Sequence, residues 1–215
     1  MREIVIWADN CSGQNKNWFL YTALVQCVNS PNSPESITLK YLEAGHTFMA
    51  ADGVHGAIGR RIKKRLLTTF NSFTIECAAS SKTIEVIEME LGDFYDITKG
   101  NRASTKYIPA LKLEGIVQVT FRKGTSTILV KNSFLDSARE VEFLKKSVLK
   151  NNSWKVLPSV LPTRRGITVA KKNGIIGTLT KDISSGDRDW WSTLSVNNDS
   201  CDLGITRDKG EMITN

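Results

Sequence analysis

An aspartate ends the first apolar segment of the chain, in the stretch IVIWADNCSGQNKN, and a cluster of amide side chains follows it. This residue is Asp9. A second aspartate, Asp52, follows a loop that contains His46, and His55 lies about one helical turn after Asp52. Carboxylate oxygens suit Mg²⁺ and Mn²⁺, whereas imidazole suits manganese or zinc better than magnesium. Two such metals about 4 Å apart can stabilise the attacking and leaving oxygens of a phosphodiester displacement. The candidate metal ligands are therefore Asp9, Asp52, His46 and His55, and the two aspartates are the candidate catalytic residues.

The same residue types also have ordinary structural uses. Aspartate is favoured in turns and at helix N-termini, where its charge is stabilising. Asp9 is therefore as compatible with a turn or capping role as with a metal site, and for Asp52 the capping role is the stronger of the two interpretations. Amides in a turn can bond the main chain and fix a loop, or they can contact phosphate and sugar. The sequence leaves both interpretations open.

A basic run, GRRIKKR, continues the helix that Asp52 is predicted to open. A solvated helix face is the usual outcome for such a run, but its position next to a candidate metal site also suits contact with a phosphate backbone. The candidate nucleic-acid-binding residues are Gln14, Asn15, Lys16, Arg60, Arg61, Lys63, Lys64 and Arg65.

Composition favours a polyanionic partner. The chain has 215 residues and a formal net charge of +7, with a pI near 9.3, and a basic protein of this kind is suited to DNA. No apolar run approaches the roughly 20 residues that span a bilayer, and the first apolar run is too short for a signal peptide. We therefore expect no membrane partner, an intracellular location and free thiols at the four cysteines.

Hydrophobic periodicity predicts the elements that position these residues. Strand, helix, strand and helix alternate over the first 70 residues, which indicates an α/β layer with at least partly parallel strands. Ligands bind beyond the carboxyl ends of such strands, where Asp9 and Asp52 would both fall. Strands are predicted at 3–8, 37–44 and 83–90, a hairpin at 115–132, and helices from Asn15 or Asn17 to 29, and at 52–68, 71–80, 168–183 and 187–194; residues 138–146 fit strand or helix.

Along the chain, we predict a core over residues 1–150, a linker and helical tail over 151–195, and disorder over 196–215. Trp154, Trp190 and Trp191 lie among basic residues in this second half. They fit either base stacking or, more commonly, the anchoring of small helices.

The stretches WADNCSGQNKN and GHTFMAADGVHGAIGRRIKK resemble a family of transposon-derived proteins of arthropods and other animals, which carry an uncharacterised domain with a DDE-transposase-type, ribonuclease H-like core. RGITVAKKNGIIGTL and RDWWSTL are similar to the C-terminal end of that family. The resemblance implies a mixed sheet with helices on both faces and two divalent metals, Mg²⁺ or Mn²⁺. The residues that match the family pattern are Asp9, Asn10, Cys11, Gln14, Asn15, Lys16, Asn17, Gly45, His46, Thr47 and Asp52.

In this family Asp9 would correspond to the second catalytic acid and Asp52 to the third or its neighbour. The first acid would lie on strands ahead of Met1, so we expect a copy truncated at its N-terminus. Its exposed sheet edge would call for a partner or a homo-oligomer. The expected function is a nuclear, transposase-derived DNA-binding protein with a remnant DDE-type site, weak or inactive alone. The alternatives are a non-catalytic nucleic-acid or protein interaction module, and a small-substrate metallohydrolase that uses the four candidate metal ligands.

Overall fold

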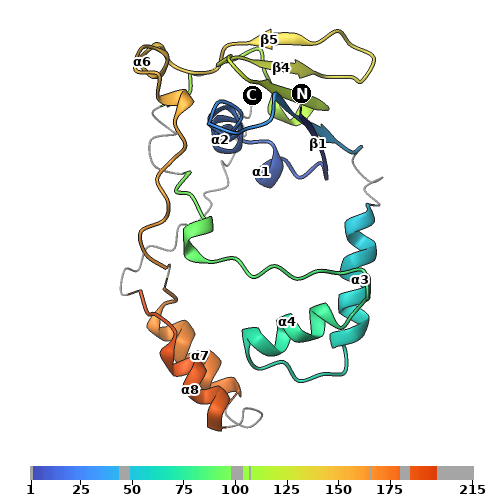
Figure 1. The fold of residues 1–215 in the computed structure, drawn as a ribbon, viewed down its shortest axis with the longest axis vertical. Helices are drawn as coiled ribbons and strands as arrows, with labels where there is room; N and C mark the ends of the chain where they lie inside the picture. The colour runs from blue at the N-terminus through green and yellow to red at the C-terminus, as the bar shows by residue number, and fades with distance from the viewer. Residues whose placement is uncertain are drawn as a thin grey trace, which may run out of the picture. The chain divides into compact units, whose positions relative to one another are not determined.

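The structure is a computed structural model in which two compact units are formed by interleaved segments of the chain (Figure 1). It describes residues 2–43, 49–97, 104–106, 108–164, 166–179 and 185–197. His46 and most of the segment predicted to be disordered therefore lie outside the described residues. Unit 1 comprises Met1–Ala50 and Met89–Pro162, and unit 2 comprises Ala51–Glu88 and Thr163–Asn215. The sequence-based division, by contrast, places a single core boundary near residue 150.

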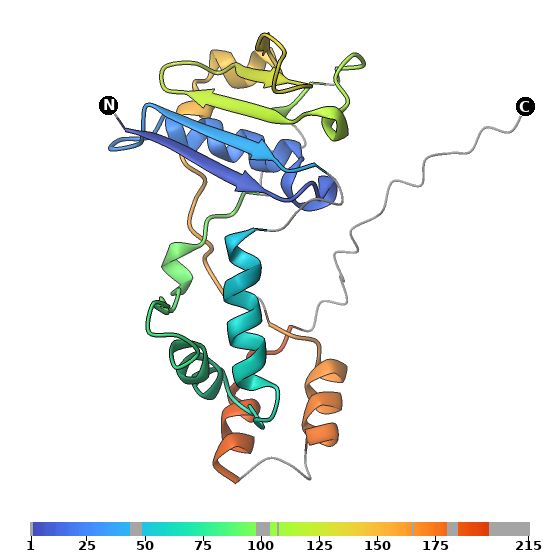
Figure 2. The same cartoon turned by 90° about the vertical axis from the view of Figure 1, so that its right-hand side faces the viewer.

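Unit 1 is an α/β unit with a five-stranded mixed sheet, whose strands follow one another in chain order. β1 and β2 are parallel, as the alternation of strand and helix predicted, and every later neighbour is antiparallel. In Figure 2 the two blue arrows point the same way and the green arrow of β3 points back. The strands are β1 (Glu3–Ala8), β2 (Ser36–Tyr41), β3 (Gln118–Arg122), β4 (Ile128–Lys131) and β5 (Arg139–Val141).

The sheet has one packed face and one polar face. Alternate residues of β2 are buried, and the strand register places Ile37 opposite Phe121 and Phe121 opposite Ile128 in one apolar row. On the other face the hydroxyls of Thr38 and Thr120 lie 3.0 Å apart. Alternation of this kind is typical of an antiparallel sheet that packs on one side only.

Helix α2 (Trp18–Val28) covers the packed face and begins where the sequence predicted. The Asn17 side chain accepts a hydrogen bond from the main-chain N–H of Leu20 and caps the helix. Tyr21, Val25 and Val28 recur on one side and are fully buried against the sheet. The resemblance implied helices on both faces, but in the described part of β2 and β3 the second face carries the polar side chains of Thr38, Lys40 and Thr120.

The remaining elements of unit 1 confirm most of the predicted segments. The hairpin is present as β3 and β4, and the segment 138–146 contains a short strand, β5, that precedes α6 (Lys146–Lys150). The strand predicted over 83–90, most of which belongs to unit 2, is wrong, because residues 84–90 have no regular structure and Ile87 is exposed. An alternating pattern needs a neighbouring strand before it forms one. The described residues of the unit also form three 3₁₀ turns: η1 (Leu91–Asp93), η2 (Leu113–Gly115) and η3 (Ser153–Lys155).

Unit 2 is helical, and among its described residues only Thr68, Thr74 and Cys77 are buried. Polar contacts link its segments: Thr68 donates to Asp187 over 2.7 Å and accepts from the Trp191 indole over 2.6 Å. Trp191 therefore anchors a helix, the commoner of its two predicted roles. None of the described helices has the length and apolar character needed to cross a membrane. The helices are α3 (Ala50–Ile62), α4 (Phe70–Ala78), α7 (Val169–Leu179) and α8 (Ser185–Thr193).

Candidate metal and nucleic-acid sites

Asp9 lies directly after β1, at the carboxyl end of the parallel strand pair, and is half-buried. Its Oδ1 atom accepts a hydrogen bond from the Cys11 N–H at 3.3 Å and another from the Asn15 side-chain amide. Among the described residues, Oδ2 has no hydrogen-bond partner. One carboxylate oxygen thus holds the turn, and the other remains available to a cation.

The amide cluster mostly fixes the loop between β1 and α2. Asn15 and Asn17 both bond within it: the Asn15 amide reaches Asp9, and the Asn17 amide donates to the Gln14 carbonyl over 2.9 Å. The four-residue helix α1 (Ser12–Asn15) forms the centre of this loop. The Gln14 side chain is exposed and makes no hydrogen bond among the described residues. Gln14 is therefore the amide of this loop that is best placed to contact a ligand.

Lys16 has an interior position. Its side chain is 3% exposed, and its Nζ donates to the main-chain carbonyl of Glu114 over 2.8 Å and lies 4.7 Å from the centroid of the Tyr41 ring. Desolvation by burial lowers the pKa of Lys16, although the nearby Glu114 carboxylate opposes the shift. Because a buried ammonium does not reach a phosphate at the surface, Lys16 has no part in the nucleic-acid contact proposed below.

Two tyrosines link this loop to the core. The Tyr41 hydroxyl donates to the Asn15 carbonyl over 2.6 Å and lies 3.1 Å from the Tyr21 hydroxyl. Burial raises the pKa of both phenols, most strongly that of Tyr21. Sequence analysis missed this pair, since each tyrosine occupies an ordinary apolar position of its own helix or strand.

Asp52 and His55 lie on α3, in unit 2. Asp52 is in the first turn of the helix, where a negative charge is favourable, and His55 is exposed three residues later, on the same side of the helix. Asp9 belongs to unit 1, so its approach to Asp52 stays a prediction. Within the described ranges, no three His, Cys, Asp or Glu side chains gather closely enough to hold a metal.

The basic run lies at the C-terminal end of α3 and the turn after it. Its five cationic side chains line a hollow of about 540 Å³, here called the basic hollow. Arg60 and Arg61 lie in the last turn of the helix, where cations interact favourably with the helix dipole. The basic hollow is lined by Arg60, Arg61, Lys63, Lys64 and Arg65.

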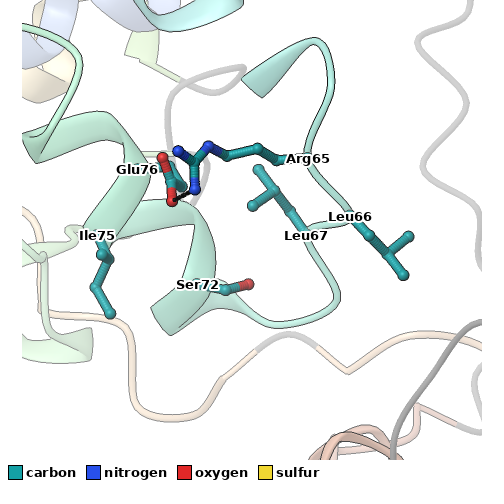
Figure 3. A pocket seen from close by; sticks show the side chains of 6 residues that line it. All are labelled: Arg65, Leu66, Leu67, Ser72, Ile75 and Glu76. Atoms are coloured by element: carbon teal, nitrogen blue, oxygen red, sulfur yellow. Dashed lines mark hydrogen bonds and ion pairs between the residues drawn. The ribbon is translucent and has the colours of Figure 1, made fainter. Parts of the chain in front are cut away.

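Glu76 of α4 divides these five cations into two groups. Its Oε2 accepts from the Nε of Arg61 and its Oε1 from an Nη of Arg65, each at 2.7 Å. Figure 3 shows Arg65 and Glu76 turned toward each other at a second hollow, of about 340 Å³, which Leu67 and Ile75 also line. The other three cations are exposed and have no ion pair among the described residues: Arg60, Lys63 and Lys64.

Comparisons with known proteins place the chain in a family. No curated protein matches the chain, and no solved structure matches it either. Residues 2–134 match the family described as a domain of unknown function, DUF7869. The matched segment is more than half of the chain and contains Asp9, Asp52 and the basic run. The chain therefore belongs to the DUF7869 family.

Proposed function

We propose that the chain binds nucleic acid, specifically DNA, and that the basic hollow contacts its phosphate backbone. The observation that carries this proposal is the group of three exposed cations, Arg60, Lys63 and Lys64, that have no ion pair among the described residues. Cations that are already paired contribute little on binding, whereas unpaired ones release counterions from the phosphates that they neutralise.

The spacing of the three cations supports the same proposal. Positions 60, 63 and 64 are three and four residues apart, and the hydrogen bond from the Lys63 N–H to the Gly59 carbonyl continues the helical turn. Side chains at this spacing lie on one side of a helix. They present a compact group of positive charges, which suits neighbouring phosphates of one strand.

Glu76 adds order to the rest of the hollow. By accepting from both Arg61 and Arg65, it fixes two flexible side chains at the edge of the group. Because the Glu76 carboxylate already pairs with both guanidinium groups, Arg61 and Arg65 contribute less to phosphate binding than the three unpaired cations. Gln14, in unit 1, is a further candidate contact to sugar or phosphate.

A second proposed function is metal binding at Asp9, supported by its unbonded Oδ2 at the carboxyl end of a parallel strand. Together with the family resemblance, this supports a transposase-derived protein with a remnant DDE-type, ribonuclease H-like site that is weak or inactive alone. Mg²⁺ or Mn²⁺ would be held by Asp9 and Asp52, with His46 and His55 as further ligands. Such a metal would supply an activated hydroxide and charge stabilisation at phosphate.

Salt-dependent binding of a fluorescent DNA duplex tests the first proposal. The Arg60→Ala/Lys63→Ala/Lys64→Ala variant should bind more weakly, and its slope of log K against log salt should be shallower by about 2 to 3. The matched control is Lys145→Ala/Lys146→Ala/Lys150→Ala, which removes three exposed cations at α6. Equal losses in both variants would show that only net charge matters and would reject the basic hollow as the site.

Titration of the chain with Mn²⁺ by calorimetry tests the second proposal. Asp9→Asn should abolish binding, and Asp52→Asn should also do so if the two carboxylates share a site. Asp189→Asn, at an exposed position of α8, is the control. If the folded wild-type chain binds no Mn²⁺, the metal-site proposal is rejected and the interpretation as a non-catalytic interaction module is retained. Metal binding without salt-dependent DNA binding would favour the small-substrate metallohydrolase.

A further inference from the structure

Strand β1 is exposed on both faces at the edge of the sheet. Its only neighbour among the described strands is β2. Register with β2 places Ile4 and Ile6 on the packed face and Val5 and Trp7 on the polar face. Val5 is 54% exposed and Trp7 51% exposed, and the two isoleucines are exposed as well.

The opposite edge of the sheet is built differently. β5 has three residues, and Arg139 and Glu140 are both exposed there. Short length and charge are the usual means by which an edge strand avoids pairing with another chain. β1 has six residues and no charge between Glu3 and Asp9, and a strand that is apolar on both faces is typical of a sheet interior. β1 therefore has the apolar composition of an interior strand, although it lies at the edge of the sheet.

We propose that β1 pairs in antiparallel fashion with β1 of a second copy of this chain, which joins the two sheets into one. Residues opposite each other must point to the same face, so the two-fold axis has to pass between the two copies of one residue. Val5 and Ile6 are the central choices for that residue. Centring on Ile6 places Glu3 opposite Asp9 of the second copy, and these like charges repel. Centring on Val5 avoids this repulsion and places Ile4 opposite Ile6 of the second copy.

Charge complementarity favours a second copy over an unrelated strand. In the register centred on Val5, Glu3 faces Trp7 of the second copy. The Nζ of Lys40 lies 5.3 Å from the centroid of the Trp7 ring, on the same face of the sheet. Glu3 has no ion pair among the described residues and would meet this ammonium across the interface, twice in a symmetric dimer.

The packed face gains a continuous apolar strip in the same arrangement. Ile4 and Ile6 extend the rows that begin at Ile37 and Leu39 of β2. In the dimer, the four isoleucines of the two copies meet on the face that carries α2 in each copy. Their burial supplies the hydrophobic contribution that a hydrogen-bonded edge contact alone lacks.

Sedimentation across a range of protein concentrations tests the proposal without nucleic acid, so its outcome is independent of the proposed function. The wild-type chain should form dimers. Val5→Lys places two like charges opposite each other and should raise the dimer Kd more than about tenfold. Leu135→Lys is the matched control, since Leu135 is 97% exposed and lies outside the strands. A monomer at every concentration, or a dimer that survives Val5→Lys, would overturn the proposal.

Cross-linking tests the register and does not depend on the lysine variant. Val5→Cys places two thiols opposite each other at the two-fold axis, within reach of a disulfide after small adjustment. Ile6→Cys is the register control, because in this register its two thiols are offset along the strands. The wild-type chain is the control for any cross-link through the native cysteines. A covalent dimer specific to Val5→Cys is expected. A link in Ile6→Cys and none in Val5→Cys would overturn the register.

Discussion

The Nζ of Lys16 donates a hydrogen bond to the main-chain carbonyl of Glu114 over 2.8 Å, between residues that are 98 positions apart. This bond joins the loop after β1 to η2, just before the strand β3. The same ammonium lies over the Tyr41 ring. Lys16 thus anchors the polar motif that follows Asp9 to the interior of unit 1, whereas Gln14 of the same motif stays exposed.

Replacing Lys16 should weaken unit 1. Lys16→Met keeps the length of the side chain but leaves the Glu114 carbonyl without its donor, so we expect a loss of about 1–3 kcal/mol in the free energy of unfolding. Urea denaturation followed by tryptophan fluorescence measures the change. Lys112→Met, at an exposed position beside η2, is the control and should change stability by less than about 0.5 kcal/mol. Equal stability of the two variants would contradict the structural role of Lys16.

The tyrosine pair should respond unequally to loss of each hydroxyl. Tyr41→Phe removes the donor to the Asn15 carbonyl and the partner of the Tyr21 hydroxyl, so it should cost about 2 kcal/mol or more. Tyr21→Phe removes one bond and should cost about 1 kcal/mol. The double variant should cost less than the sum of the two, because no hydroxyl is left unpaired. Chemical denaturation of the three variants measures this coupling, and simple additivity would contradict it.

Stability should fall in alkaline solution. Burial raises the pKa of Tyr21 and Tyr41 in the folded chain, so above about pH 10 the unfolded chain ionises first and stability is lost as pH rises. Lys16 acts in the opposite sense. Because its pKa is lowered in the folded chain, its contribution to the free energy of unfolding rises with pH between that lowered pKa and about pH 10.4. The Tyr21→Phe/Tyr41→Phe variant should therefore lose less stability than wild type between about pH 10 and 11. Urea midpoints at several pH values provide the measurement.

Removal of the Glu76 charge should strengthen nucleic-acid binding. Glu76→Gln releases Arg61 and Arg65 from their carboxylate, so affinity for DNA should increase and the salt slope should steepen by up to about 1. The effect on stability should be small, about 0–1 kcal/mol, because both arginines are substantially exposed. Glu142→Gln, which breaks the exposed pair with Lys106 in unit 1, is the charge-matched control. Identical binding by the two variants would contradict a specific role for Glu76.

Local signals determined several elements of this protein. The apolar run of β1, the Asn17 cap of α2 and the alternating hairpin are each encoded by residues that are close in sequence, and all three are present as predicted. The parallel pairing of β1 and β2 also follows, since a helix that connects two strands returns the chain in the same direction. The position of Asp9 at the end of β1 is a direct consequence.

Other features depended on contacts that the sequence does not reveal. The alternating segment 83–90 resembles a strand but finds no neighbour to pair with in the described structure. Lys16 reads as one more surface cation, yet the approach of η2 buries it. Glu76 lies on α4, whereas Arg61 lies on α3 and Arg65 lies in the turn after it. Helix periods and capping residues act over a few positions, whereas burial, ion pairing and sheet edges are set by segments far apart in the chain, and only the tertiary structure brings these together.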